Sequence, residues 1–252
     1  MRMLSFARRN AREMLRDPLT VIFSLGFPLV LLLLLSAIQA NIPVALFEIQ
    51  HLTPGISVFG LAFMSLFSAT LIARDRESAF LQRLYTTPLR AVDFIFGYAL
   101  PVIPLALGQS VVCYVAALAL GLDLTVGILY ALLFIIPVSL LFIAVGLLCG
   151  SILNVKQVGG LCGALLTNLT AWLSGGWFDL ELVGGAFRAV AYALPFVHAV
   201  ELERTLLTGS FEGVLGHLVW VLGYVVVIMA AAVALFLRQM RKYLLIFTGQ
   251  MV

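Results

Sequence analysis

The sequence predicts an all-α integral membrane protein with six transmembrane helices. Of its 252 residues, 63% are hydrophobic and only 11% are charged, and a water-soluble globular fold cannot cover that much apolar surface. None of the apolar runs carries an acidic or basic residue at its centre. Runs long enough to cross about 30 Å of hydrocarbon, roughly 20 residues each, occupy residues 20–39, 55–73, 97–121, 126–150, 157–175 and 214–237.

The distribution of basic residues predicts the orientation of this bundle. Only Arg188 and Arg204 lie on one side of a six-span topology, so the positive-inside rule places the other side, with both termini, in the cytoplasm. We expect a multi-pass protein of the cytoplasmic (inner) membrane. The net charge of +3 reflects anchoring to anionic lipid and indicates no nucleic-acid partner. The basic residues on the expected cytoplasmic side are Arg2, Arg8, Arg9, Arg12, Arg16, Arg74, Arg76, Arg83, Arg90, Lys156, Arg238, Arg241 and Lys242.

Residues 1–17 predict an amphipathic helix that lies in the plane of the membrane surface. At 100° per residue its apolar side chains, from Met3 to Leu15, share one arc. The pair Asp17-Pro18 then ends the helix and redirects the chain into the first span. On the opposite arc, where we expect contact with lipid phosphates, lie Arg2, Arg9, Arg12 and Arg16.

Residues 74–87 predict a second amphipathic helix, on the cytoplasmic side after the second span. Its apolar arc holds Phe80, Leu81, Leu84 and Tyr85, and the opposite arc is mostly charged. Thr87 and Pro88 supply an N-cap and a first-turn proline, which restart a helix heading back into the membrane. The alternative interpretation is an ordinary cytoplasmic loop with solvated charges.

Three features further along the chain refine this picture. Pro101 and Pro104 should bend the third span, because proline removes a backbone donor. Gln109, near mid-membrane, favours an interhelical hydrogen bond over a substrate contact. Residues 176–212 form the only long outer segment, and their short helical pattern predicts a re-entrant or interfacial hairpin. We find no repeat or linker, and expect one domain over residues 1–252.

Signatures of catalysis are missing from the sequence. It has no phosphate-binding Gly-x-x-x-x-Gly-Lys-Ser/Thr loop, no His-Glu-x-x-His and no Gly-x-Ser-x-Gly. We therefore expect a non-catalytic membrane subunit without a metal site or cofactor of its own. Secondary transporters usually keep ionisable groups inside the membrane, and none is found in these spans. An ATP-independent six-span secondary transporter or channel is the alternative function.

Several features together resemble the permease subunits of ABC-2-type ABC exporters. They are the charged cluster, the pattern Leu-x-Arg-Leu-x-x-Thr-Pro-Leu over residues 81–89, the basic N-terminus, the six spans and the outer sequence 194–201. Ser78-Ala79 departs from the Gly-Thr common in that family. The resemblance implies the ABC-2 (type V exporter) fold, in which residues 74–87 are a coupling helix seated in a groove of a separate ATPase. The coupling residues it implies are Arg74, Asp75, Arg76, Glu77, Phe80, Leu81, Arg83, Leu84 and Tyr85.

The same resemblance implies a substrate path and partners. In the family, the second and fifth spans of two protomers line a central cavity, under outer helices that form a lid. An amphipathic drug, peptide antibiotic or lipid would suit such a lining; the alternative is that these phenylalanines face lipid or pack between helices. The implied partners are two copies of an ABC ATPase, which hold ATP and Mg²⁺, a second permease protomer in a homo- or heterodimer, and membrane lipids. The implied path residues are Phe59, Phe63, Phe67, Thr167, Asn168 and Thr170.

Overall fold

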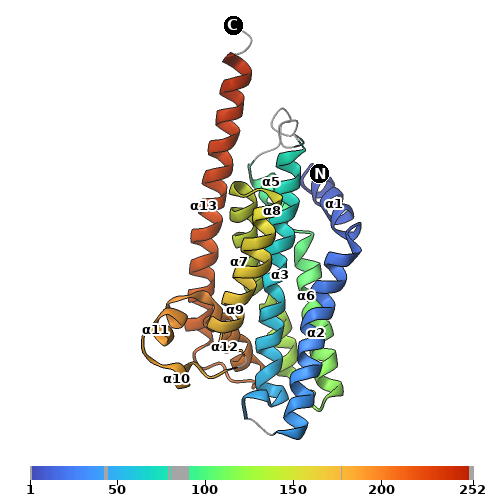
Figure 1. The fold of residues 1–252 in the computed structure, drawn as a ribbon, viewed down its shortest axis with the longest axis vertical. Helices are drawn as coiled ribbons and strands as arrows, with labels where there is room; N and C mark the ends of the chain where they lie inside the picture. The colour runs from blue at the N-terminus through green and yellow to red at the C-terminus, as the bar shows by residue number, and fades with distance from the viewer. Residues whose placement is uncertain (1, 43–44, 79, 81–90, 177, 250–252) are drawn as a thin grey trace.

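The computed structural model describes residues 2–42, 45–78, 80, 91–176 and 178–249, and every regular element among them is a helix. Figure 1 shows the helices packed side by side, with short outer helices at one end. The elements are α1 (Arg2–Leu15), α2 (Pro18–Asn41), the 3-10 helix η1 (Ala45–Phe47), α3 (Ile49–Glu77), α5 (Ala91–Ala99), α6 (Val102–Ala119), α7 (Val126–Ile152), α8 (Val155–Val158), the π-helix η2 (Gly159–Leu166), α9 (Thr167–Leu173), α10 (Leu180–Val183), α11 (Gly185–Ala193), α12 (Pro195–Leu207) and α13 (Val214–Gly249).

Five helical segments in this part of the chain are long and apolar enough to cross a membrane: Val21–Asn41, Ile49–Glu77, Val92–Ala119, Val126–Ile152 and Val214–Gln239. They overlap five of the six expected spans. The expected span at 157–175 is instead a succession of short helices, α8, η2 and α9, so the sixth span stays a prediction. The third span is interrupted near the expected proline, because α5 ends at Ala99 and α6 begins at Val102, with Pro101 between them.

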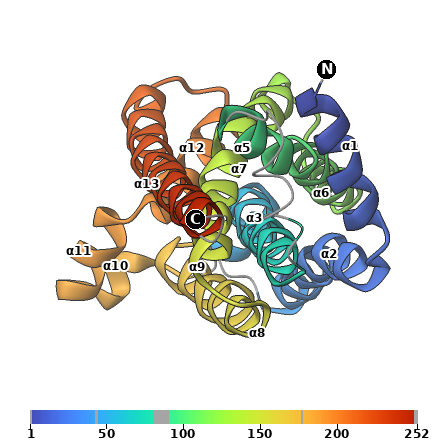
Figure 2. The same cartoon turned by 90° about the horizontal axis from the view of Figure 1, so that it is seen from above.

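Helix α3 occupies the centre of the bundle. In its most apolar stretch 83% of the residues are buried, against 17% in α2 and α13, and Figure 2 shows the other helices arranged around it. Two glycines of α7, Gly146 and Gly150, allow the closest approach to α3. A Cβ at Gly146 would overlap Ser68, and one at Gly150 would overlap the backbone of Ala69. Small residues four apart permit such close helix packing in membranes.

Gln109, the polar residue in the third span, forms a hydrogen bond to a neighbouring helix. Gln109 is fully buried, and its Nε2 donates to the Ser57 carbonyl of α3 at 3.4 Å. Gly60 of α3 makes room for the Gln109 amide, since a Cβ there would overlap it. The expected interhelical hydrogen bond is therefore confirmed.

The outer segment is helical but contains no element long enough to span. Its helices α10, α11 and α12 have 4, 9 and 13 residues. Gly184 and Gly185 have φ of 61° and 55°, a left-handed backbone that favours glycine, and they turn the chain between α10 and α11. Apolar side chains of this hairpin stay exposed, including Leu182 at 86%. These lengths agree with a re-entrant or interfacial hairpin.

The last helix, α13, has 36 residues. The stretch Val214–Gln239 is long and apolar enough to cross a membrane, and the helix continues after it for ten more residues, or about 15 Å, toward the C-terminus. Figure 1 shows this extension rising above the neighbouring helices on the side where α3 ends.

One acidic residue of the outer segment is buried, which the sequence did not predict. Glu203 of α12 is fully buried, and its Oε2 accepts a hydrogen bond from the Tyr114 hydroxyl at 3.3 Å. Among the described residues no group bonds its Oε1. Burial disfavours the carboxylate and raises the pKa of Glu203 well above its usual range, although the Tyr114 hydrogen bond acts in the opposite direction.

This burial predicts a pH-dependent stability. A group whose pKa is higher in the folded state stabilises the fold at pH values below its unfolded-state pKa. This contribution is lost as the pH rises through its folded-state pKa. Thermal unfolding of the detergent-solubilised chain should therefore shift to lower temperature from about pH 5 to pH 8. Glu203→Gln should flatten this slope and raise the midpoint at pH 8 by about 2–4 °C. The exposed Glu212→Gln is the control, and equal slopes in all three proteins would contradict the assignment.

Candidate functional site

An apolar groove of about 800 Å³ lies between α2, α3 and the η2–α9 segment. Three phenylalanines form its aromatic wall: the ring centroids of Phe27 and Phe63 are 5.8 Å apart, and those of Phe59 and Phe63 are 6.0 Å apart at 86°. Edge-to-face geometry of this kind is the favoured arrangement of aromatic pairs. The lining residues are Phe23, Phe27, Leu31, Phe59, Phe63, Leu66, Gly163, Ala164, Thr167, Asn168, Ala171 and Trp172.

The groove contains four of the six predicted path residues: Phe59, Phe63, Thr167 and Asn168. Phe59 and Phe63 share one face of α3, since residues four apart lie on the same side of a helix, and α9 brings Thr167 and Asn168 to that face. Asn168 Nδ2 donates to the Ala164 carbonyl at 2.8 Å, which leaves the amide oxygen as an acceptor. A wide apolar surface with few polar groups suits a largely apolar ligand.

The other two predicted path residues lie outside this groove. Thr170 is fully buried, and its hydroxyl donates to the Leu166 carbonyl of the preceding turn at 2.9 Å. Phe67 is 5% exposed and lines a second cavity, the α1–α3 cleft, of about 530 Å³. Leu66 lines both cavities, so they adjoin along α3. The residues of the α1–α3 cleft are Arg9, Glu13, Met14, Arg16, Asp17, Leu66, Phe67, Thr70, Leu71, Arg74, Asp75, Ser78, Val155 and Gly159.

The residues Arg74–Glu77, predicted to start the coupling helix, are instead the last turn of α3, which therefore extends past Ala73. Because consecutive side chains of a helix point about 100° apart, these four reach different neighbours. Arg74 pairs with Asp17 at 3.4 Å, and both side chains are partly exposed. The Glu77 carboxylate accepts a hydrogen bond from the Val155 backbone N–H at 3.0 Å, at the start of α8.

Arg76 contacts the end of α7. The last carbonyls of a helix lack partners within it and attract basic side chains. The Arg76 guanidinium donates to the carbonyls of Gly150 at 2.9 Å and Ile152 at 3.4 Å. Gln239 of α13 donates to the Ser151 carbonyl between them at 2.6 Å. The end of α3 is thereby tied to both α7 and, through it, α13.

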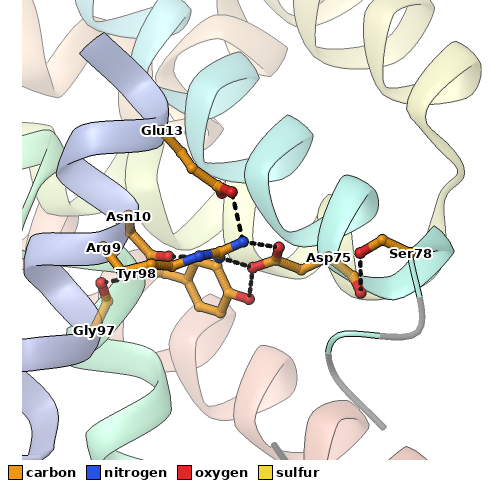
Figure 3. Close-up of polar contacts among 7 residues, drawn as sticks. All are labelled: Arg9, Asn10, Glu13, Asp75, Ser78, Gly97 and Tyr98. Carbon is orange, nitrogen blue, oxygen red and sulfur yellow. Dashed lines mark hydrogen bonds and ion pairs between the residues drawn. The ribbon is translucent and has the colours of Figure 1, made fainter. Parts of the chain in front are cut away.

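Asp75 is the centre of a buried ion pair. It is 2% exposed, and Arg9 of α1 donates to its two carboxylate oxygens at 2.6 and 2.8 Å, the bidentate geometry of strong Arg–carboxylate pairs. The hydroxyl of Tyr98 in α5 donates to the same carboxylate at 2.6 Å. Figure 3 shows Arg9, Tyr98 and Asp75 converging from three different helices.

The neighbours of Arg9 complete this cluster. Glu13 accepts a hydrogen bond from Arg9 at 2.6 Å, and Asn10 donates to the Gly97 carbonyl at 3.0 Å, as Figure 3 shows. The Phe80 ring lies 4.1 Å below the guanidinium. Burial disfavours the charged form of Arg9, but Asp75, and to a smaller extent Glu13, outweigh it and raise the pKa of Arg9. The charge of Arg9 is therefore held by the protein.

The predicted interface and coupling residues differ in their surroundings: some bond other parts of the chain, some are exposed, and some lie outside the described residues. Arg9 was predicted to reach lipid phosphates; in the structure its guanidinium bonds Asp75 and Glu13 within the chain, and the contact with lipid stays a prediction. Arg12 is exposed on α1 and Arg16 is exposed just after it, and Arg2 begins that helix. Asp75 and Phe80 contact α1 within the chain. Leu81, Arg83, Leu84 and Tyr85 lie outside the described residues.

Polar pairs between residues far apart in the sequence were not predicted. Asp75 and Arg9 are 66 positions apart, so no local pattern links them. His217 of α13 lies with its Nδ1 3.0 Å from Nδ1 of His198 in α12. In the described part of the chain, no cluster of three or more His, Cys, Asp or Glu side chains could hold a metal ion.

The model of the family described as "ABC-2 type transporter" matches residues 2–208. A comparison with curated proteins finds no match for the chain.

The ion pair between Arg9 and Asp75 can be tested by a double-mutant cycle. Asp75→Asn removes the carboxylate from a partly buried guanidinium, so we expect a loss of about 2 kcal/mol, or about 4–8 °C in the thermal midpoint. Combining it with Arg9→Gln should add little, because the two side chains act as one unit. Glu181→Gln, which removes an exposed ion pair to Arg188, is the control and should shift the midpoint little. Additive effects of the two changes would argue against a direct pair.

Proposed function

The chain belongs to the ABC-2 type transporter family, and we propose that it is the transmembrane permease subunit of an ATP-driven exporter. A separate ABC ATPase, in two copies, supplies the energy and holds ATP and Mg²⁺. The chain pairs with a second permease protomer, and the pair sits in the cytoplasmic membrane with both termini in the cytoplasm. The segment at 155–173 forms the sixth span, since its 19 residues are within the length that a crossing helix needs.

One observation carries the proposal: a single helix, α3, bears both the groove and the charged end. Phe59 and Phe63 line the groove in the middle of α3, and Arg74–Glu77 end the same helix just before the predicted coupling segment. A continuous helix transmits displacement along its length better than a loop does. Movement of the coupling segment would therefore reach the groove directly, as alternating access requires.

The groove supports an amphipathic substrate. Its aromatic wall offers apolar contact, and Thr167 and Asn168 offer a hydroxyl and an amide. Such a lining does not select a strongly charged solute, whose desolvation would be costly there. We propose that the substrate is a drug, a peptide antibiotic or a lipid-like molecule, and that it moves outward.

The coupling role of residues 80–87 rests on their sequence pattern. The apolar arc of Leu81, Leu84 and Tyr85 would dock in a groove of the ATPase. Arg74–Glu77 would not touch the ATPase but would receive the movement of the docking segment, because they bind α1, α7 and α8. In this arrangement the ATPase moves the segment, and the end of α3 distributes that movement among the helices.

Replacement of a groove phenylalanine tests the substrate site. Phe63→Ala should raise by about three- to tenfold the concentration of an amphipathic dye that half-maximally stimulates ATP hydrolysis, since an aromatic contact contributes about 0.5–1.5 kcal/mol. The measurement uses the complex of permease and ATPase in liposomes. Phe96→Ala removes an exposed ring of α5 outside the groove and should leave the stimulation unchanged. Identical curves for the two variants would refute the site.

A charge placed on the apolar arc tests the docking segment. Leu84→Asp should still insert in the membrane but fail to co-purify with the ATPase, because an unpaired carboxylate in an apolar interface is costly. Gln82→Asp introduces the same carboxylate on the opposite arc and should keep the complex together. Full co-purification of the Leu84→Asp protein would contradict docking through this segment.

A further inference from the structure

The α1–α3 cleft combines charged and apolar walls at the end of the bundle where α1 meets the spans. Its charged residues are three arginines and three carboxylates, so it has no net charge. The apolar part comes from Met14 of α1 and from Leu66 and Leu71 of α3. Leu66 also lines the groove, so the apolar wall continues toward the membrane interior. A site that is polar at one end and apolar at the other fits a lipid better than a water-soluble ion.

The charges of the cleft are separated along α1. Arg9 is shared by two carboxylates, Asp75 and Glu13, so acid is in excess around Arg9. Asp17 forms an ion pair with Arg74 and follows Arg16 in the chain, so basic groups are in excess just beyond the end of α1. Figure 1 shows α1 descending from the N-terminus toward α2, which places the basic end nearer to the spans.

The guanidinium groups at the basic end of the cleft have N–H donors that are available to a ligand. Arg16 is exposed, and none of the described residues forms an ion pair or hydrogen bond with its guanidinium. Arg74 has one ion pair, at 3.4 Å, and its side chain is 58% exposed. Guanidinium groups bind phosphate oxygens in a bidentate manner. Two such groups beside an apolar wall form a site for the phosphate of a lipid.

The acidic end of the cleft suits a cation. Glu13 has one oxygen bonded to Arg9 at 2.6 Å, and its side chain remains 40% exposed. An ammonium group has three donors and no acceptor, so it can bind there, whereas a quaternary ammonium has no N–H to donate. In a phospholipid of the leaflet next to α1, the amine lies further from the hydrocarbon than the phosphate. That order matches the acidic and basic ends of the cleft.

We propose that the α1–α3 cleft binds the head group of a zwitterionic phospholipid with a primary ammonium, its phosphate between Arg16 and Arg74 and its ammonium at Glu13. The bound lipid fills the space between α1 and α3, with its acyl chains toward Leu66. This site depends on the membrane location of the chain and not on the ATPase partner. Its test can therefore fail without affecting the proposed transport function.

The test measures lipid binding to the purified full-length chain in detergent, by native mass spectrometry. Phosphatidylethanolamine, phosphatidylcholine and phosphatidylglycerol with the same acyl chains are titrated separately. Phosphatidylethanolamine should bind about tenfold more tightly than either of the others, because only it satisfies both ends of the cleft. Water-soluble phosphoethanolamine should bind far more weakly, since it lacks the apolar part. Equal binding of phosphatidylglycerol and phosphatidylethanolamine would overturn the proposal.

Variants assign the two ends of the site. Arg16→Gln and Arg74→Gln should each weaken phosphatidylethanolamine binding about tenfold. Glu13→Gln should reduce the affinity for phosphatidylethanolamine to that for phosphatidylcholine. Arg12→Gln removes the same charge four residues before Arg16, outside the cleft, and should bind like the wild type. If Arg12→Gln weakens binding as much as Arg16→Gln, the effect is general attraction to the membrane, and the site is refuted.

A second substitution protects the test against misfolding. Arg16→Lys keeps the positive charge but loses the bidentate geometry, so it should fold normally and bind phosphatidylethanolamine with intermediate affinity. Thermal unfolding without added lipid verifies that each variant is folded. Wild-type affinity in both Arg16 variants would place the phosphate elsewhere and overturn the assignment.

Discussion

A buried carboxylate, Asp75, determines how one end of this helix bundle is assembled. A buried charge is costly unless it is paired and hydrogen-bonded, and the partners of Asp75 come from elsewhere in the fold. Arg9 comes from α1 and Tyr98 from α5, so both helices must sit beside the end of α3 to satisfy it. The neighbouring side chains of Arg76 and Glu77 extend this to α7 and α8. One turn of α3 thus joins the ends of helices that are far apart in the sequence.

Because α3 is central in the bundle, the helix that carries this junction also contacts α7 and lines the groove. The helix is closely packed against α7 through Gly146 and Gly150, and side chains in such a contact have little room to adjust. By contrast, the face of α3 toward α2 and α9 opens into the aromatic groove. One side of α3 is therefore fixed to the bundle, and the other is available to a ligand. Asymmetry of this kind lets a rigid helix serve both as scaffold and as part of a binding surface.

Periodic patterns in the sequence predicted many of the helices. They did not predict contacts between residues that are far apart in the sequence. The apolar runs, the α1 amphipathic helix and the proline break before α6 follow from local composition and spacing. The groove residues Phe59 and Phe63 were predicted from the family resemblance, which implies that the second span lines a cavity, and their spacing of four residues places both on one helix face. The pairing of Arg9 with Asp75 was not predicted, since the position of Arg9 on α1 is typical of a basic residue at the surface and its partner is 66 positions away. Glu203 lies in the outer segment, and only its packing against Tyr114 shows that it is buried.

The length of α13 constrains the shape of anything that binds to the bundle at the end of α3. The helix continues about 15 Å beyond the stretch that is apolar enough to cross a membrane, on the side where α3 ends (Figure 1). A protein seated over that end meets this extension as a lateral wall. Its footprint is therefore bounded on one flank, and approach is open only from the directions that α13 does not occupy. The last helix acts as a steric guide for docking even where it makes no specific contact.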